Sequence, residues 1–470
     1  MQYGFWSVVP PLLTIILALI TKNVFVSLFI GVCLGSLILA DWAVLTGVNN
    51  AFYSFVHTFE SNSNTILLMS MLLIGALIYL IEKSGGIDGF VEIMVKKRGL
   101  IKSKRGANLF TWLLGIVVFT SGSLSCMVTG SVSRPVNDAL KVPHEKSAFI
   151  VHATSTPWCV LFPFSGWLAA LAGYFTSGGV PESESITMLF ESIPLNFYCI
   201  LAVVGTLLVA IFGLNIGPMK AAEERAERTG ELDEPGHGTG SAEDAKSVSG
   251  AKPRAINMLL PMGTMIGVII ATLLITGSGD ITAGNGMQAL LWGCISSVFV
   301  AAAMCVIEKI FTVEQVINEL FHGMSTMLPI ACIMLFGLTM GTIVSSLDTG
   351  NYLSSIFTQL LTPALLPAIA YIICVLLSFS TGTSMGTMSI MSVIAFPMAI
   401  NMGVSIPLVG AAVFGGSIFG DHASPISDTT IMSCATTGCN IIDHVKTQIP
   451  YVAIYAAASL VLYVVMGFVM

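Results

Sequence analysis

Two acidic residues, Asp421 and Asp428, lie inside a long apolar segment of this chain. A carboxylate at membrane depth is costly, so it is by default a candidate ion ligand or proton carrier. Na⁺ and H⁺ can compete for the same carboxylate oxygen. One such site, reached in turn from each side of a membrane, is sufficient to exchange the two ions. We therefore expect Asp421 and Asp428 to bind Na⁺ and carry protons, with the neighbouring His422 as a third proton carrier.

Hydroxyl-bearing residues cluster in four polar segments that interrupt apolar stretches, residues 120–125, 152–158, 380–384 and 415–430. Each segment also contains Gly or Pro, which loosen a helical backbone. Such backbone persists at membrane depth only where it lines a cavity or is buried in protein, and its oxygens are hard ligands that suit Na⁺. The candidate ion- or substrate-binding residues are Ser121, Ser123, Ser125, Thr154, Ser155, Thr156, Thr381, Thr383, Ser384, Asp421, Ser424, Ser427, Asp428 and Thr429. The expected Na⁺ ligands among them are Asp421, Asp428, Thr383 and Ser384.

Each of these residues also has a purely structural explanation. A Ser or Thr in a membrane helix commonly bonds the carbonyl four residues earlier, and the two carboxylates could cap the halves of a broken helix. His152 and His422 could be satisfied polar neighbours instead of titrating groups. Trp158, Phe164 and Trp167 could wall a substrate cavity or pack in the core. The four interruptions lie at matching positions in the two halves of the chain. Chance alone would not place them there twice, so the repetition favours a functional role.

The composition indicates a helical membrane protein. Of the 470 residues, 55% are hydrophobic and 10% are charged, whereas soluble domains average about 25% charged residues. More than half of the charges lie in residues 82–105 and 217–256, so the rest of the chain is nearly uncharged. This distribution excludes soluble globular, disordered and nucleic-acid-binding proteins. Continuous apolar runs also exclude an outer-membrane barrel, whose strands alternate in polarity.

The apolar runs predict an all-α polytopic fold with about ten full spans, each needing about 20 residues. The expected spans are 5–21, 24–40, 65–82, 147–176, 193–214, 257–276, 286–307, 327–347, 407–440 and 449–470. The spans 147–176 and 407–440 contain polar breaks, so we expect two broken transmembrane helices. The interrupted stretches 106–137 and 364–400 are expected to be re-entrant hairpins, and 43–60 and 311–326 to be amphipathic interfacial helices.

The basic residues predict the orientation. If both hairpins leave the membrane on the side where they enter, all 19 Lys and Arg residues face one side. Basic loops stay in the cytoplasm, so we expect a multi-pass protein of the plasma membrane with both termini outside. The linker 215–256 is then cytoplasmic, and its Gly, Glu, Asp and Ser content predicts a flexible segment.

The chain is predicted to contain two inverted repeats, residues 1–214 and 257–470, joined by the linker 215–256. Each half runs through two spans, an interfacial helix, a span, a hairpin, a broken span and a last span. The sequence Phe119-Thr120-Ser121-Gly122-Ser123 is matched about 260 residues later by Phe379-Ser380-Thr381-Gly382-Thr383. Inverted repeats with interrupted helices are typical of secondary transporters, whose binding site lies near the membrane midplane.

Residues 419–430 (FGDHASPISDTT) resemble the signature of the NhaC family of Na⁺/H⁺ antiporters, within the ion transporter superfamily. Residues 438–440, 443–451, 134–135 and 154–158 are similar to that family as well. The resemblance implies a scaffold domain, a mobile transport domain with the hairpins and broken helices, sodium coupling, and a homodimer. Members of the family exchange Na⁺ for protons, exchange organic acids or take up amino acids.

We therefore predict a sodium-coupled secondary active transporter, a Na⁺/H⁺ antiporter working by alternating access. One alternative is a sodium-coupled carrier of a small amino acid or organic acid, whose carboxylate would bind at helix N-termini. A second alternative is a passive channel or scaffold. No enzymatic motif accompanies the candidate residues, and the expected ligands are Na⁺, as transported or coupling ion, and H⁺ or a small organic solute. The expected surroundings are a lipid bilayer, with no nucleic acid partner and no cofactor.

Overall fold

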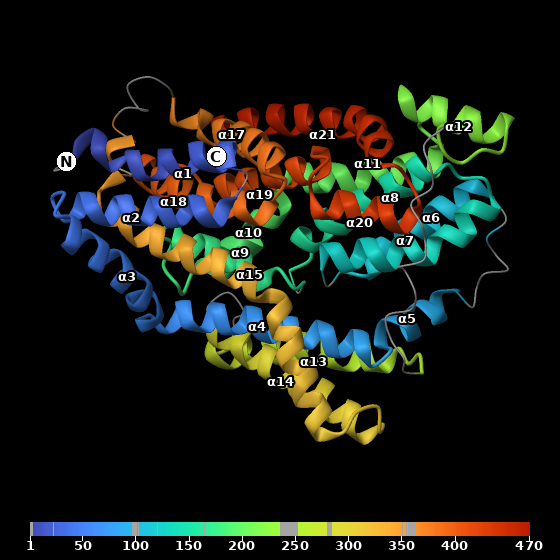
Figure 1. The fold of residues 1–470 in the computed structure, drawn as a ribbon, viewed down its shortest axis with the longest axis horizontal. Coiled ribbons are helices and arrows are strands. Elements are labelled where there is room, and N and C mark those ends of the chain that lie inside the picture. The colour runs from blue at the N-terminus through green and yellow to red at the C-terminus, as the bar shows by residue number, and fades with distance from the viewer. Residues whose placement is uncertain are drawn as a thin grey trace.

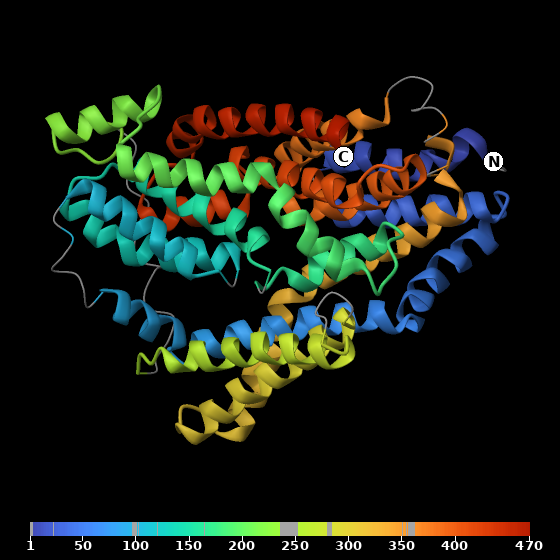
Figure 2. The ribbon, with the colours of Figure 1, turned by 180° about the vertical axis from the view of Figure 1, so that it is seen from behind.

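Helices make up the regular structure throughout residues 3–235, 252–279 and 284–470 of the computed structural model. Within these ranges residues 22, 96–100, 102, 120, 164, 350, 354 and 356–361 are not described. Most helices lie side by side in one block, and α4, α13 and α14 form a second group beside it (Figures 1 and 2). The long helix α15 connects the two groups. An all-α fold is therefore confirmed.

The first half of the chain contains α1 to α11. Their bounds are α1 Val9–Thr21, α2 Val24–Leu39, α3 Val44–Glu60, α4 Asn62–Lys83, α5 Gly86–Val95, α6 Lys104–Val117, α7 Gly122–Ala139, α8 His144–Leu161, α9 Leu168–Ser177, α10 Ser185–Ser192 and α11 Phe197–Phe212. Short 3₁₀ helices occupy Gly4–Ser7 and Ile193–Leu195.

The second half follows the linker helix α12, Pro218–Arg228. Its elements are α13 Ile256–Thr276, α14 Gly286–Ile307, α15 Val313–Ser346, a 3₁₀ turn Pro363–Leu365, α17 Leu366–Thr381, α18 Ser384–Met402, α19 Ile406–Ala423, α20 Asp428–Thr437 and α21 Ile441–Val469. The two helix–break–helix pairs α6–α7 and α17–α18 coincide with the two expected hairpins.

Seven helices in the described ranges are long and apolar enough to cross a membrane, or eight if the pair bent by 45° between α10 and α11 counts as one span. About ten were expected. The expected spans 5–21 and 24–40 form helices of 13 and 16 residues, and the two broken spans are divided into shorter helices. An apolar run therefore overestimates the length of a helix that ends at a polar turn.

Three of the four predicted breaks are confirmed, between α6 and α7, at residues 382–383, and at residues 424–427. The fourth prediction is wrong, because α8 continues through Pro157 to Leu161 and the break lies between α8 and α9. A proline removes one N–H from the helical ladder, and neighbouring helices can accommodate that loss. Residues 152–156 are fully buried in this part of α8, so packing on all sides maintains the helix.

The prediction of a separate interfacial helix at 311–326 is also wrong. Residues 313–346 form the single 34-residue helix α15, which begins at a capping box on Thr312. Pro329 lies inside α15, which changes direction along its course (Figure 1). The mixed polarity of 311–326 thus marks one end of a long helix. The corresponding segment of the first half does form its own helix, α3.

Helices α4 and α15 cross at two glycines. A β-carbon added at Gly75 would lie 2.6 Å from the carbonyl oxygen of Gly323, and one added at Gly323 would lie 2.7 Å from the α-carbon of Ala76. Small residues allow membrane helices to approach this closely. The same contact fixes the position of Met327, one turn further along α15.

We expect Gly75→Ala to destabilise the protein by about 1–3 kcal/mol, because the added methyl group meets backbone that cannot move aside. Gly267→Ala is the matched control, since a β-carbon there meets nothing within 4 Å. Thermal unfolding in detergent should show a lower melting temperature for Gly75→Ala only. Equal melting temperatures for the two variants would contradict the close crossing.

The linker 215–256 begins with an ordered helix, although its composition predicts flexibility. Glu223 of α12 accepts hydrogen bonds from Lys104 of α6 at 2.9 Å and from Lys146 of α8 at 3.0 Å. Arg225 donates to Glu145 at 2.8 Å. Helix α12 therefore holds the ends of α6 and α8 together through partly or fully buried ion pairs. Residues 236–251 lie outside the described part of the chain.

His144, which precedes the apolar part of α8, extends this cluster. Its Nδ1 lies 2.9 Å from Asp233 and its Nε2 lies 3.1 Å from Asp138. Burial disfavours the charged imidazolium, but the hydrogen bonds and charges of the two carboxylates outweigh it and raise the pKa of His144 to about 9. The ordinary value is near 6.5. The charged His144 therefore contributes its full stabilisation of the fold below about pH 6.5. This contribution is lost as the pH rises through 9.

We expect the melting temperature of the protein to fall between pH 6 and pH 9.5 by more than that of His144→Gln, which cannot titrate. His322→Gln, at an exposed position of α15, is the control and should behave as the unmodified protein. Thermal unfolding in detergent across this pH range measures the effect. The same pH dependence in all three proteins would refute the role of His144.

Candidate functional site

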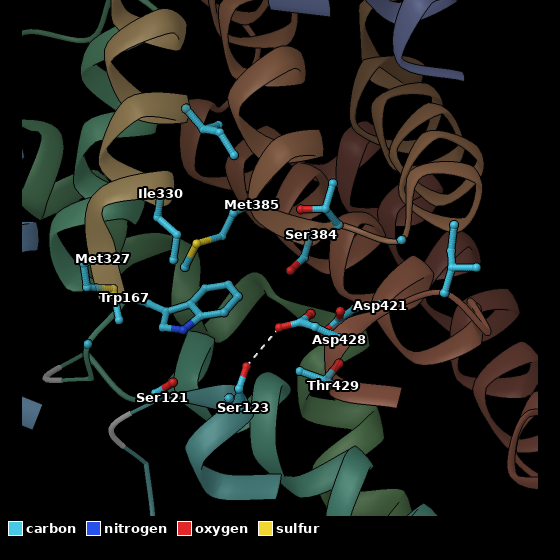
Figure 3. Close-up of a pocket in the computed structure, with 16 residues that line it drawn as sticks. Ser121, Ser123, Trp167, Met327, Ile330, Ser384, Met385, Asp421, Asp428 and Thr429 are labelled. Carbon is cyan, nitrogen blue, oxygen red and sulfur yellow. Dashed lines mark hydrogen bonds between the residues drawn. The ribbon is translucent and has the colours of Figure 1, made fainter. Parts of the chain in front are cut away.

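The four helix breaks meet at one cavity, which we call the central cavity (Figure 3). It has a volume of about 360 Å³. Its lining residues are Ser121, Gly122, Ser123, Gly166, Trp167, Met327, Ile330, Ile333, Gly382, Thr383, Ser384, Met385, Asp421, Ile426, Asp428 and Thr429. Both halves of the chain thus contribute their interruptions to the same place, and α15 closes one side.

Four helices begin at the central cavity, namely α7, α9, α18 and α20. Side-chain hydrogen bonds do not cap α7, α9 or α20, whereas Thr383 caps α18 by accepting from the N–H of Gly386. A helix N-terminus carries a partial positive charge of roughly half a unit and presents unpaired N–H groups. Many of the lining residues lie at the first positions of these four helices. The site therefore combines positive helix ends with carboxylates.

Asp421 lies in the last turn of α19 and is 2% exposed. Its Oδ1 accepts a hydrogen bond of 2.6 Å from the Ser427 hydroxyl. Its Oδ2 is buried and has no hydrogen-bond partner in the described part of the chain. A buried, unpaired carboxylate oxygen is costly. Asp421 therefore has one carboxylate oxygen without a partner in the described ranges, at the lining of the cavity.

Asp428 is the first residue of α20 and points across the cavity towards α7 (Figure 3). The Ser123 hydroxyl donates a 3.0 Å hydrogen bond to its Oδ2. This contact joins the first hairpin to the second broken helix. The capping alternative is not observed for either carboxylate, because the N-cap of α20 is Ser427 and no side chain caps it.

Seven of the fourteen predicted binding residues line the central cavity. They are Ser121, Ser123, Thr383, Ser384, Asp421, Asp428 and Thr429. Those that do not line it are Ser125, Thr154, Ser155, Thr156, Thr381, Ser424 and Ser427. Ser427 is placed behind the cavity, where it binds Asp421. All four predicted Na⁺ ligands lie in the lining, and two of them are carboxylates.

The structural alternative holds for several of the residues outside the lining. Thr154 donates to the carbonyl of Ile150 at 2.7 Å, and Thr381 donates to that of Leu377 at 2.9 Å. Ser155 bonds the carbonyl of His152, and Ser125 bonds that of Gly115. Their hydroxyls satisfy helix carbonyls, as Ser and Thr do in membrane helices. The hydroxyls of Thr156 and Ser424 are buried and lack a partner in the described ranges.

A buried polar network lies directly behind the cavity. His152 contacts the Thr429 hydroxyl through Nε2 and His444 through Nδ1, both at 3.0 Å. Thr429 lies 3.0 Å from the Ser427 hydroxyl, which binds Asp421. His422 does not line the cavity and contacts the Tyr198 hydroxyl at 3.0 Å. His152 thus positions Thr429, which lines the cavity, whereas His422 lies outside the lining.

Sequence reasoning missed the apolar side of the cavity on α15. Met327, Ile330 and Ile333 face it from α15, and Met385 and Ile426 complete it. Apolar residues in an apolar helix give no signal in one sequence, because lipid-facing and cavity-facing positions look alike. Trp167 lines the cavity, as predicted by the interpretation that it walls a substrate cavity. Trp158 does not line it, and Phe164 lies outside the described residues.

The fold is similar to that of a known transporter. The crystal structure of the Alcanivorax borkumensis YdaH transporter matches with a TM-score of 0.61, over 90% of this chain and 89% of that chain, at 16% sequence identity. At this identity the likeness concerns the fold. It agrees with the helical membrane architecture.

Two relatives are similar in sequence. An uncharacterized protein of Haemophilus influenzae is 32% identical over 98% of this chain and 91% of its own length. The malate-2H⁺/Na⁺-lactate antiporter of Bacillus subtilis is 26% identical over 34% of each chain. The first match extends over nearly the whole of this chain.

The sequence model of the Na⁺/H⁺ antiporter family matches residues 158–468, which include α9, the second hairpin and both carboxylates. This match confirms the resemblance drawn from residues 419–430. It also confirms the expectation of a secondary active antiporter of the membrane and excludes the assignment of the chain to a family of enzymes. The chain belongs to the Na⁺/H⁺ antiporter family.

Proposed function

We propose that the central cavity is the exchange site of this antiporter, where Na⁺ and H⁺ bind in turn. The observation that carries the proposal is the unpaired Oδ2 of Asp421, buried at the meeting point of four helix breaks. A carboxylate in this setting must be neutralised by a proton or a cation. Because both ions use the same oxygen, binding one releases the other.

Four side chains supply oxygen ligands for the transported Na⁺. Asp421 and Asp428 provide the charge, and Thr383 and Ser384 approach from the break between α17 and α18. The hydroxyls of Ser121, Ser123 and Thr429 line the same space. All of these are hard oxygen donors, as Na⁺ prefers. The Ser427 hydroxyl holds Asp421 in place from behind.

Alternating access follows from the repeated organisation. We propose that residues 1–214 and 257–470 are inverted repeats, each with a hairpin and a broken span. Their breaks at 118–121 and 382–383, and at 162–167 and 424–427, are about 260 residues apart. Two oppositely oriented copies can exchange conformations, which opens the site to one side and then to the other.

The exchange proposal makes a direct prediction. Asp421→Asn should abolish Na⁺-dependent dissipation of a pH gradient in proteoliposomes, because the amide cannot release a proton. Ser427→Ala should weaken the apparent Na⁺ affinity by roughly tenfold, as the loss of a residue that orients a metal ligand does. Ser433→Ala is the control, since that hydroxyl bonds the carbonyl of Thr430 away from the cavity.

Proton flux is followed with a pH-sensitive dye as the NaCl concentration rises. Sodium-driven flux that persists in Asp421→Asn would exclude this residue as the exchange site. The proposal would fail altogether if the unmodified protein showed no sodium-dependent flux.

The orientation is a separate proposal. We propose that both termini lie outside and that the linker 215–256 is cytoplasmic, because all 19 basic residues then share the cytoplasmic side. We expect alkaline phosphatase, which is active only outside the cytoplasm, to be active when fused to the C-terminus and inactive when inserted in the linker. A fluorescent protein that folds only in the cytoplasm should give the opposite pattern. The reverse result would overturn the orientation.

A further inference from the structure

The hydrogen bonds behind the central cavity form a chain that runs from Asp421 through Ser427 and Thr429 to His152. All four residues are buried. A hydroxyl has one proton to donate, and an uncharged imidazole has one N–H and one bare nitrogen that accepts. The donor and acceptor roles along the whole chain are therefore fixed once the roles at either end are fixed.

The cavity end of the chain is the carboxylate of Asp421, which in its charged, Na⁺-binding form can only accept hydrogen bonds. The Ser427 hydroxyl donates to its Oδ1 at 2.6 Å. Ser427 has no second proton, so the Thr429 hydroxyl must donate to Ser427 across 3.0 Å. Thr429 must then accept from Nε2 of His152, also at 3.0 Å. This end of the chain therefore requires the His152 tautomer with its proton on Nε2.

The far end of the chain requires the same tautomer independently. Helix α19 ends at Ala423, so the His422 carbonyl is one of the last four carbonyls, which have no partner within the helix. Nε2 of Gln448 donates to this carbonyl at 2.7 Å, which fixes the orientation of the Gln448 amide. The same Nε2 lies 3.2 Å from Nδ1 of His152. Nδ1 must therefore be the bare, accepting nitrogen.

His444 is consistent with this assignment. Its Nε2 lies 3.0 Å from Nδ1 of His152, and two ring nitrogens at that distance need one proton between them. With Nδ1 of His152 bare, the proton belongs to Nε2 of His444. The opposite arrangement would leave an N–H on Nδ1 of His444, which is buried and has no partner in the described part of the chain. A buried N–H without an acceptor is costly.

The direction of the chain presents a donor to Oδ1 of Asp421. Reversal would place a proton on Nδ1 of His152, facing the N–H groups of Gln448, and two donors in contact repel each other. Oδ1 is therefore held as an acceptor. Oδ2, which has no partner in the described ranges, is the oxygen left for Na⁺. Groups that orient a metal ligand from behind change metal affinity by roughly 10–100-fold.

We propose that Gln448 is a positioning residue for the Na⁺ site, although it is not among the described lining residues of the cavity. It holds His152 in the tautomer with the proton on Nε2. The Thr429 and Ser427 hydroxyls then carry that orientation to Oδ1 of Asp421. Helix α21 thus acts on a ligand of α19 through α8 and α20. The inference rests on the proposed function, because it takes Asp421 as a Na⁺ ligand.

Nitrogen NMR of the purified full-length protein, with isotopically labelled histidine and in NaCl, measures the tautomer directly. Protonated and bare ring nitrogens resonate at different frequencies, and His152→Gln identifies the His152 signals by their loss. We expect the proton on Nε2 and a bare Nδ1. A proton on Nδ1 would overturn the inference.

Gln448→Met keeps the length of the side chain and removes both N–H donors. The form of His152 with its proton on Nδ1 should then appear in the NMR spectrum. In proteoliposomes the apparent Na⁺ affinity should weaken by roughly tenfold, while the maximal sodium-driven proton flux stays within about twofold of that of the unmodified protein. Thr447→Val is the matched control and should change neither, because the Thr447 hydroxyl bonds the Asp443 carbonyl within α21 at 2.8 Å.

Unchanged Na⁺ affinity in a folded Gln448→Met variant would refute the positioning role. If that variant does not fold, the tautomer of His152 in the unmodified protein decides alone. Sodium-driven flux together with a proton on Nδ1 of His152 would overturn this inference and leave the exchange site standing. Absence of sodium-driven flux in the unmodified protein would overturn the exchange site and this inference with it.

Discussion

The structure depends on the balance between the carboxylates of Asp421 and Asp428 at the cavity and the positive helix ends that surround them. Asp421 is buried and could not carry a charge in an apolar bundle without a compensating potential, because an isolated buried charge is strongly disfavoured. The N-termini of α7, α9, α18 and α20 supply that potential, and the described lining residues include no Lys or Arg. Each break in a helix therefore has an electrostatic role, since it creates the N-terminus that faces the cavity.

Close packing around the cavity keeps these helix ends in place. The crossing of α4 and α15 at Gly75 and Gly323 determines the position of the apolar side chains of α15 that line the cavity. At the other end of the molecule, Glu223 of α12 accepts hydrogen bonds from α6 and α8. This contact fixes the end of α6, with which the first hairpin begins. The two contacts act differently, because the first is steric and the second is ionic. Only the ionic one is sensitive to pH and salt.

The sequence alone predicts the helical class, three of the four breaks and both carboxylates, because Gly, Pro and acidic residues stand out from an apolar background. The prediction fails where one residue type can have either of two structural roles. Pro157 and Pro425 look equivalent, yet only Pro425 lies in a break, since packing on all sides of α8 tolerates the missing hydrogen bond. Hydroxyls such as Thr154 and Thr381 satisfy helix carbonyls, and no pattern separates them from Thr383. Which apolar residues face the cavity depends on tertiary contacts alone.

The two halves of the chain are not the two working parts in space. Ser123 of the first half binds Asp428 of the second, and His152 of α8 binds Thr429 of α20. The Thr436 hydroxyl of α20 also donates to the carbonyl of Cys126 in α7. Motion of one half against the other would break all three contacts at once. These contacts join α7, α8 and α20 beside the cavity, whereas α4, α13 and α14 form the second group of helices (Figure 1).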